Sequence, residues 1–566
     1  MIYHLESIEK GIKKAKSKKE FEFYIAMKEI LDGILNLHKR IINYFEKIEF
    51  DENSKRILNA YRKIPLSPPD NFFESVLAVN FIFYIDGCDS LERFDYIWYT
   101  YYERDKKLGK ITKEEATMII ENLWKNFDDN NGWNVTIGGS DKNGLSSYNE
   151  LTLICLEAIK RKRRPNLALK IRKDMPEEIF LKAIEVIETG NGLPALYNEE
   201  LYIEGLKENH LNIYYKDIFD FAFVGCTETT IHGKSNIGSL DGGINLVGFL
   251  SEVIDKKLLI CETFQDFLNE YKNVLKLEIE KMAYQINLYQ EWRAKYLPQV
   301  IRSLFIDDCL ESGIEFNNGG ARYNWSIINV GGLANVSDSL YTIKKIIYEE
   351  NYPKDRFIKA LENNFYRNED LFYRIKKLPK FGNDIYEVDE IAKEISDFVL
   401  MNCRNIRAGK EGSLSQVVYC FVTYVGAGIG IKATPDGRRN NEPIADSIGP
   451  HQGRDKSGPT AMLRSISKIN YKKGIGSLVL NIRFSKTLFK NYNSKKAIIN
   501  LIKTFFELSG MQLQINVVDQ EVLKDAIKNP EKYENLIVRV GGYSEYFNRL
   551  SYDLKLSILE REEHNG

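Results

Sequence analysis

A cysteine and a glutamate lie two residues apart in the segment FAFVGCTETT, over 221–230. A β-like run there ends at Gly225, Cys226 opens a tight loop, and Glu228 follows. In an extended loop this spacing can aim a thiol and a carboxylate at one cavity, and a thiol beside a general acid or base is a recurrent catalytic pair. Taken alone, the segment favours a simpler interpretation, a buried inert cysteine and a glutamate that caps the next segment.

The residues that would activate a nucleophilic cysteine are missing from this neighbourhood. A thiolate nucleophile normally needs a histidine, and of the six histidines in the chain His232 is the closest in sequence. No Cys/His/Asn signature of a thiol hydrolase surrounds it, and no histidines and cysteines have metal-ligand spacing. The sequence therefore predicts no bound metal and no ordinary nucleophilic activation of Cys226.

A second segment, LIVRVGGYSEYF over 536–547, brings two glycines to the end of a β-like run. Gly541 and Gly542 favour a hairpin turn, which is the simplest interpretation. Glycine also has a chemical property of its own, because loss of a hydrogen from its α-carbon gives a planar radical that the flanking amide and carbonyl delocalise. No side chain crowds that centre, and glycine accepts the backbone angles that a buried loop tip demands.

These two segments resemble the paired signatures of the glycyl radical enzymes. VRVGGYSEYF is similar to the motif in which an Arg-Val-x-Gly-Tyr core carries the radical on the glycine before the tyrosine, here Gly542 and not Gly541. VGCTE resembles the cysteine loop of the same family. The resemblance runs from about Ile64 to His564, through blocks such as RFDYIWYTYYERD, TIGGSD, RPNLALKI, NGLPALYNEE, GGARYNWS and QLQINVVDQEVLKDAIKNPEKY. The chain is therefore identified as a member of the pyruvate formate-lyase-like superfamily.

The resemblance implies both a fold and a radical cycle. The fold would be a ten-stranded α/β barrel of two five-stranded half-barrels surrounded by helices, with the cysteine and glycine loops meeting inside. A separate radical S-adenosylmethionine activating enzyme would remove a hydrogen from Gly542. The resulting glycyl radical would take a hydrogen from Cys226, and the thiyl radical would take one from a small-molecule substrate. Oxygen would cleave the chain at Gly542, and we expect a homodimer.

The neighbours of Cys226 indicate which branch of the family the chain resembles. Pyruvate formate-lyase uses two adjacent cysteines, whereas Thr227 follows Cys226 here, which argues against acyl transfer. Glu228 matches the eliminase and decarboxylase branches, where this glutamate handles protons around the substrate. Eliminases also place an aspartate further along, and Asp241 in SLDGGIN is its counterpart, although a role in turning the loop is equally compatible. Cys88 stands where many diol dehydratases have a histidine.

We therefore expect a dehydratase-like elimination that breaks a C–X bond in a small polar substrate. Decarboxylation or C–C cleavage of a small carboxylic acid is the first alternative, and Arg322 or Arg483 would favour it by binding a carboxylate if either faced the pocket. Surface salt bridging is the competing role for each arginine. A catalytically silent binding homologue is an alternative of another class, and the joint retention of Cys226, Glu228 and Gly542 argues against it.

The elements that must position these residues alternate between short strands and helices. The pattern predicts a capped helix over 112–128, with Thr112 and Glu115 forming a capping box. Other strands and helices are predicted in α/β alternation; the strands are 167–171, 219–224, 325–330, 478–484, 513–518 and 536–540, and the helices are 178–189, 262–283 and 389–401. One catalytic domain, 1–566, is the simplest account. It comprises a shortened helical N-terminal part (1–63), the barrel body (64–510) and the glycyl radical region (511–566).

Composition excludes several classes of partner. The 566 residues include 79 Lys and Arg and 80 Asp and Glu, so the formal net charge of −1 indicates neither nucleic acid nor an anionic membrane as a partner. The seven cysteines are odd in number and form no CxxC pair, which favours reduced thiols. The N-terminal residues lack the apolar core of a secretory signal, and the longest apolar run, 76–85, is too short to span a bilayer. We therefore expect a cytoplasmic protein.

Overall fold

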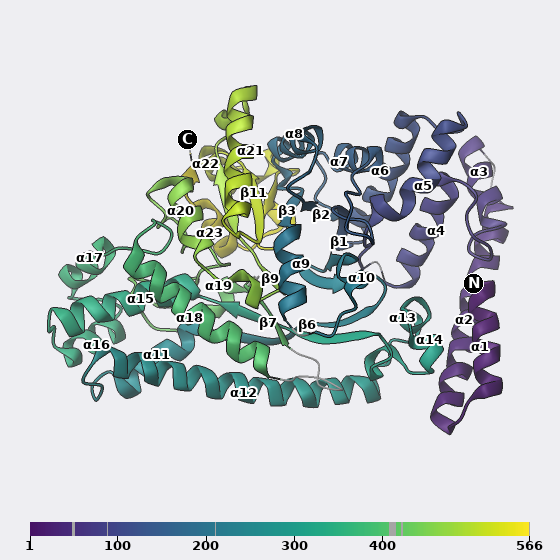
Figure 1. Cartoon of the computed structure of the whole chain (residues 1–566). Helices are drawn as coiled ribbons and strands as arrows, with labels where there is room; N and C mark the ends of the chain where they lie inside the picture. The colour runs from purple at the N-terminus through teal and green to yellow at the C-terminus, as the bar shows by residue number, and fades with distance from the viewer. Residues whose placement is uncertain (48–50, 88, 210, 407–414, 420–422, 565–566) are drawn as a thin grey trace.

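The strands lie in the middle of the molecule and most helices lie on its outside (Figure 1). The computed structural model describes residues 1–47, 51–87, 89–209, 211–406, 415–419 and 423–564. Within these residues no helix is both long and apolar enough to cross a membrane. No group of three or more His, Cys, Asp or Glu side chains in the same part of the chain is arranged to hold a metal ion.

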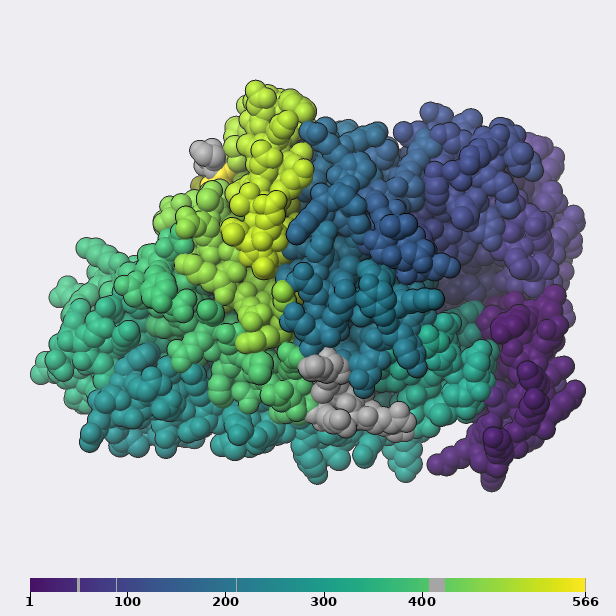
Figure 2. Space-filling model, viewed as in Figure 1, coloured from purple at the N-terminus to yellow at the C-terminus, as the bar shows by residue number. Residues whose placement is uncertain are grey.

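The N-terminal helices form a lobe at one edge of the molecule, shown in purple in Figures 1 and 2. They are α1 (Ile2–Lys14), α2 (Lys18–Phe45) and α3 (Glu52–Tyr61). Ser17 and Asp51 begin α2 and α3 by accepting hydrogen bonds from backbone N–H groups of the first turn. These helices pack around a hydrophobic core that is separate from the main core and that also includes Phe81, Leu304 and Leu310. The helical character predicted for 1–63 is confirmed, while its role as a separate part of one catalytic domain stays a prediction.

A six-stranded sheet with the order β1-β2-β3-β11-β10-β14 forms the larger half of the barrel. Its strands are β1 (Asn134–Gly138), β2 (Asn166–Ile171), β3 (Ala195–Asn198), β10 (Asn481–Phe484), β11 (Gln512–Val517) and β14 (Glu563–His564). Neighbouring strands run parallel except β3 and β11. Strands β1, β2, β3 and β11 are buried at every position, which is typical of strands covered on both faces.

A four-stranded parallel sheet, β6-β7-β8-β9, forms the other half. Its strands are β6 (Ser235–Asn245), β7 (Tyr323–Gly331), β8 (Ser415–Tyr419) and β9 (Ser477–Leu478). The α/β barrel is confirmed. In the described residues the ladder strands form one sheet of six, in which the short C-terminal strand β14 pairs with β10, and one sheet of four, where two sheets of five were predicted.

Two connections join the half-barrels. The predicted single strand over 478–484 is two strands, because the chain leaves the four-stranded sheet after β9 and enters the six-stranded sheet at β10. On the other side, a hairpin of β4 (Phe221–Val224) and β5 (Glu228–Ile231) contacts both β1 and β6.

A second hairpin, β12 (Ile537–Arg539) with β13 (Ser544–Tyr546), packs on β11.

Amphipathic helices cover the barrel. The α-helices of nine or more residues outside the N-terminal lobe are α4 (Phe72–Ile85), α5 (Phe94–Lys107), α6 (Lys113–Asp129), α7 (Glu150–Ala158), α8 (Glu177–Val186), α9 (Glu199–Glu208), α11 (Leu246–Lys257), α12 (Phe264–Tyr296), α15 (Leu333–Thr342), α16 (Lys354–Glu362), α17 (Glu369–Lys377), α18 (Tyr386–Asn405), α20 (Gly458–Ser467), α21 (Tyr492–Glu507), α22 (Gln520–Lys528) and α23 (Tyr552–Glu560). The long helix α12 runs beneath β6 and β7 in Figure 1, and it extends well past the end predicted at 283.

The start of α6 confirms half of its predicted capping box. The Thr112 side chain accepts a hydrogen bond from the backbone N–H of Glu115. The Glu115 carboxylate does not return to the cap, because it pairs with Arg56 of α3 at 2.7 Å. An ion pair between two helices thus replaces the second half of the box.

Candidate active site

Gly542 lies at the tip of the β12–β13 hairpin, inside the protein. The hairpin closes through a backbone hydrogen bond from Val540 to Tyr543 of 2.9 Å. Gly542 is buried and has φ +85°, a left-handed conformation in which an L side chain would be strained. The backbone just before it is held by Arg561, which donates to the carbonyls of Arg539, at 2.8 Å, and Val540, at 2.5 Å.

Both polar groups of Gly542 have buried side-chain partners. Its N–H donates to Gln514 Oε1 at 3.2 Å. Its carbonyl accepts from Asn166 Nδ2 at 2.7 Å and from Arg539 Nη2 at 3.1 Å. Arg539 also donates to Gln514 Oε1 and Asn166 Oδ1, each at 2.6 Å, so the three side chains form one network around a single peptide unit. These bonds hold the Gly542 peptide unit in one orientation, although Gln514 Nε2 has no hydrogen-bond partner among the described residues.

Cys226 lies at the tip of the β4–β5 hairpin and reaches the same network. The turn needs Gly225 at φ +54°, and the N–H of Gly225 donates to Ser90 Oγ at 3.3 Å. The carbonyl of Cys226 accepts from Asn166 Nδ2 at 2.5 Å, and this is the same nitrogen that donates to Gly542. The predicted meeting of the cysteine and glycine loops inside the barrel is thereby confirmed.

The surroundings of Cys226 keep its thiol protonated. Burial raises the pKa of the Cys226 thiol far above its usual value, and the nearby charge of Glu228 raises it further. The guanidinium groups of Arg164 and Arg539 act in the opposite direction but do not outweigh burial. A thiolate nucleophile requires a lowered pKa. A neutral S–H group instead retains the hydrogen atom that a radical reaction transfers.

We predict that Cys226 resists alkylation at a pH where an ordinary cysteine reacts. Iodoacetamide reacts with the thiolate, which forms near pH 8.5 in an unfolded chain. At pH 9 we expect Cys226 to react at least about 100-fold more slowly in the folded protein than in urea, measured by peptide mapping. Glu228→Gln removes one cause of the raised pKa, so its Cys226 should react faster than that of the wild type. Equal folded and unfolded rates would contradict a raised pKa.

Glu228 is buried beside the cysteine and is held by two donors. One carboxylate oxygen, Oε1, accepts from Ser239 Oγ of β6 at 2.5 Å, and Oε2 accepts from the backbone N–H of Thr227 at 2.9 Å. The carboxylate therefore has a fixed place next to the turn that carries Cys226. That place is suited to moving a proton to or from a molecule at the thiol.

We predict that Gly225→Ala disturbs the cysteine turn. An added Cβ would lie 2.8 Å from Glu228 Oε2 and would be strained at φ +54°. We expect a loss of about 1–2 kcal/mol in the free energy of unfolding, from the cost of a left-handed conformation. Thermal unfolding followed by circular dichroism measures the change. Gly33→Ala, in helix α2 with nothing within 4 Å of the added carbon, is the control and should be neutral or stabilising. A Gly225→Ala melting temperature equal to that of Gly33→Ala would contradict this account.

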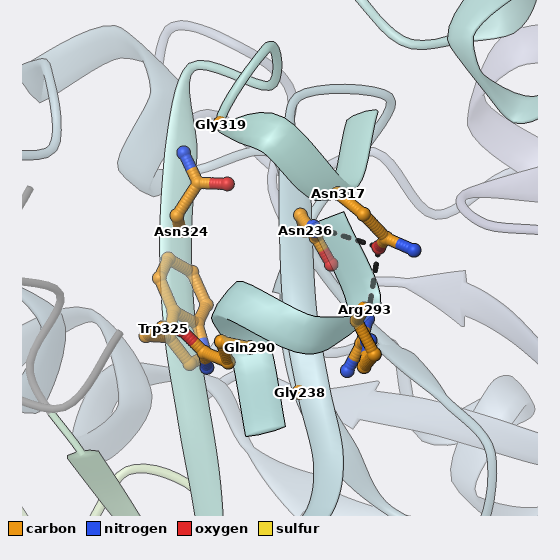
Figure 3. Close-up of a pocket in the computed structure, with 8 residues that line it drawn as sticks. All are labelled: Asn236, Gly238, Gln290, Arg293, Asn317, Gly319, Asn324 and Trp325. Atoms are coloured by element: carbon orange, nitrogen blue, oxygen red, sulfur yellow. Dashed lines mark hydrogen bonds between the residues drawn. The ribbon is translucent and has the colours of Figure 1, made fainter. Parts of the chain in front are cut away.

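The Asp241 side chain is hydrogen-bonded to helix α12 and to strand β7. Its carboxylate accepts from Gln290 Nε2 at 2.9 Å, Ser326 Oγ at 2.8 Å and Arg293 Nη1 at 3.3 Å. Gln290 and Arg293 belong to α12 and line the small pocket shown in Figure 3. This pocket is lined by Asn236, Gly238, Gln290, Arg293, Asn317, Gly319, Asn324 and Trp325. On strand β6 it is Ser239, not Asp241, that contacts the cysteine turn through Glu228.

The two candidate arginines are engaged elsewhere as well. Arg322 forms a two-point ion pair with Asp308, both distances being 2.7 Å, and these hydrogen bonds raise its pKa. Arg483 is buried and donates to the carbonyls of Ile558, Leu559 and Arg561, and burial lowers its pKa to about 10. The structure therefore joins neither arginine to the Cys226 turn. Cys88 lies outside the described residues.

The network around Gly542 was not among the predicted site residues. Asn166, Gln514 and Arg539 each lie in a sequence block that carries the family resemblance. A local signal was present in β11, where Gln512, Gln514 and Asn516 alternate with apolar residues although the whole strand is buried. A buried strand with one polar face indicates a face that binds polar partners.

A barrel in which a cysteine hairpin and a glycine hairpin meet at one amide is the arrangement that the resemblance to glycyl radical enzymes implies. Comparison of the sequence with family models identifies the family of the chain. Residues 2–428 match the family model described as pyruvate formate lyase-like, and residues 444–548 match the model described as glycine radical. The chain belongs to the pyruvate formate lyase-like family of glycyl radical enzymes.

Relatives and solved structures indicate the kind of reaction. Trans-4-hydroxy-L-proline dehydratase of Clostridioides difficile is 29% identical over 95% of this chain and 74% of its own length. A structure from work on 1,2-propanediol dehydration in Roseburia inulinivorans has a TM-score of 0.93 and 28% identity, covering 99% of this chain and 78% of that one. The structure of the glycerol dehydratase of Clostridium butyricum has a TM-score of 0.91 and 28% identity, covering 100% of this chain and 78% of that one. The chain is a glycyl radical lyase of the dehydratase-like, eliminating type.

Proposed function

We propose that Gly542 stores the radical, that Cys226 passes it to the substrate, and that Glu228 moves the proton of a dehydratase-like elimination. The observation that carries this proposal is the shared donor Asn166, which bonds the carbonyls of Cys226 and Gly542 at 2.5 and 2.7 Å. Reactive groups that lie on one rigid support are already oriented for each other.

Gly542 fits the radical that the family implies. It has no side chain to crowd a planar α-carbon, and its N–H and carbonyl are both hydrogen-bonded. Burial keeps water and other hydrogen donors away from it. The radical supplies the power to break a strong bond by removing one hydrogen atom, and the protein supplies orientation and exclusion.

The transfers balance without an added oxidant. The S–H bond of Cys226 breaks as a C–H bond forms at Gly542, and the sulfur then removes a hydrogen atom from a substrate carbon. An adjacent leaving group departs while Glu228 accepts or delivers the proton that keeps the charge balanced. The product carbon takes its hydrogen atom back from Cys226, and Gly542 returns a hydrogen to the sulfur.

The proposed substrate is a small polar molecule that carries a hydroxyl leaving group next to a carbon with a removable hydrogen atom. The support comes from the relatives, which are named for hydroxyproline, propanediol and glycerol. The condition that would favour a carboxylic acid substrate, an arginine facing the cysteine turn, is not met by Arg322 or Arg483. Elimination is preferred to decarboxylation because these relatives are dehydratases; the arginines whose charge reaches the Cys226 thiol are Arg164 and Arg539.

The proposal also includes a partner protein. A radical S-adenosylmethionine activating enzyme would remove the hydrogen from Gly542. A homodimer and a cytoplasmic location stay predictions of the sequence, and a measurement of molar mass in solution tests the first.

The test is to activate the purified chain anaerobically with such an enzyme and record its electron paramagnetic resonance spectrum. The expected result is a doublet from the single hydrogen on the α-carbon of Gly542. The activated protein is then given vicinal diols, glycerol and hydroxylated amino acids, and products are identified by mass spectrometry. A chain that never gives the doublet with a competent activating enzyme would refute the proposal.

A further inference from the structure

We infer that Asn166 is a positioning residue that sets the distance for hydrogen transfer between Gly542 and Cys226. The inference rests on the proposed function and adds to it a residue whose side chain bonds the backbone of both loops. Asn166 begins strand β2, a rigid element of the barrel wall, and its side chain is fully buried. The strand therefore holds the Asn166 side chain in a fixed position between the two loops.

One amide group holds three partners from two distant parts of the chain, the cysteine hairpin and the glycine hairpin. Asn166 Nδ2 donates to the carbonyl of Cys226, 60 residues away, and to that of Gly542, 376 residues away. Asn166 Oδ1 accepts from Arg539 Nη1 at 2.6 Å, which fixes the orientation of the amide. A primary amide has two N–H hydrogens, so both carbonyls can be satisfied at once.

The two loops depend on Asn166 unequally. The Gly542 carbonyl keeps a second donor in Arg539, and its N–H keeps Gln514. The Cys226 carbonyl has Asn166 as its side-chain donor, and the rest of the turn is held through the neighbours Gly225 and Glu228. Loss of the Asn166 amide should therefore leave Gly542 in place and release Cys226 from it.

This asymmetry predicts a split between storing the radical and transferring it. Hydrogen transfer requires the two heavy atoms to be close and aligned, and a displacement of about 1 Å can cost 10²-fold in rate. Storage requires only that Gly542 stays buried and bonded. An Asn166 variant should hold the radical and pass it on slowly.

The experiment follows the glycyl doublet after transfer of the activated protein into deuterium oxide. The Cys226 thiol exchanges its hydrogen with solvent, so each round trip of the radical can place deuterium on the α-carbon of Gly542. Deuterium couples far more weakly than hydrogen, so the doublet collapses to a single line. The rate of collapse reports transfer between the two residues without any substrate.

Asn166→Asp and Asn166→Ala are compared with the wild type. Aspartate has the same shape and still accepts from Arg539, but it places an oxygen against the two carbonyls. We expect both variants to give the doublet and to collapse at least about 10-fold more slowly than the wild type. Asn198→Ala is the matched control, because Asn198 is also buried and also donates to two carbonyls, those of Phe506 and Gly510, at 2.9 and 2.8 Å. It should collapse at the wild-type rate.

The outcomes separate this inference from the proposed function. No doublet in the wild type refutes the proposed function. Doublets of normal intensity that collapse at the wild-type rate in both Asn166 variants overturn the positioning role. A doublet that is lost only in the Asn166 variants, while circular dichroism shows folded protein, would mean that Asn166 is needed to store the radical. That result overturns the prediction that Asn166 affects transfer and not storage.

A measurement on the unmodified sequence does not depend on the folding of any variant. Activated wild-type protein labelled with ¹⁵N-asparagine should show a ¹⁵N coupling in electron–nuclear double resonance, since the amide of Asn166 donates to the carbonyl of the radical residue. Absence of that coupling would contradict the hydrogen bond on which the inference rests.

Discussion

Cys226→Ser is expected to abolish turnover by more than about 10⁴-fold while the radical on Gly542 remains. This loss corresponds to more than roughly 5 kcal/mol in the activation barrier. The O–H bond of serine is stronger than the S–H bond of cysteine, so a glycine-centred radical cannot take its hydrogen. The activating enzyme acts on Gly542, so the doublet should form with normal intensity. In deuterium oxide it should not collapse, because the route through the thiol is gone.

A second cysteine with a raised pKa provides the control for this substitution. Cys403 is buried, and burial raises its pKa to about 12. It lies on α18, outside the cysteine turn. Cys403→Ser should keep both turnover and the collapse of the doublet. Turnover by Cys226→Ser at more than a hundredth of the wild-type rate would show that another group removes the substrate hydrogen.

The predicted residues that the structure brings together at the two hairpins share one property, which is that their sequence signal is local. Cys226 and Glu228 lie two residues apart, and Gly542 stands inside one contiguous motif. Asn166 is joined to Gly542 across 376 residues, and only folding brings them together. No short sequence motif predicts a residue whose role is to bond two loops that are distant in sequence.

The fold shows the same limit in strand β6. In its sequence, SNIGSLDGGIN, the SLDGGIN part was considered as a loop that Asp241 could turn. The whole segment is instead an 11-residue strand paired in parallel with β7, with an irregularity between Gly238 and Gly242. A Cβ at Gly242 would lie 2.7 Å from the Met282 sulfur of α12, so the glycine allows this helix to approach the sheet. Glycine here reflects tertiary packing, which local propensity does not contain.

The strand over 478–484 was predicted as one element because the segment LVLNIRF reads as a single β-like run. The structure shows that the run crosses from one half-barrel to the other. Burial on both sheets gives the same apolar pattern, so periodicity cannot mark the crossing point. The predicted α/β alternation was confirmed because it depends only on the type and order of elements.

Gly542→Ala is expected to remove both the doublet and all turnover. The φ of +85° strains an alanine, and its methyl group crowds the planar centre that the radical requires. If a radical did form on alanine, its methyl hydrogens would give more than two lines, so spectroscopy distinguishes the two residues. We expect no signal and a loss of turnover greater than about 10⁴-fold, measured on the compound that the wild type converts.

The neighbouring glycine decides whether this loss is specific. Gly541 is also buried, but a Cβ added there meets nothing within 4 Å, and its φ is not in the left-handed region. Gly541→Ala should keep the doublet, and after exposure to air its activated chain should be cut beside residue 542, as in the wild type. Gly542→Ala should stay intact in air, because no radical is present to react with oxygen. Cleavage of Gly542→Ala, or loss of the doublet in Gly541→Ala alone, would move the radical to the other glycine.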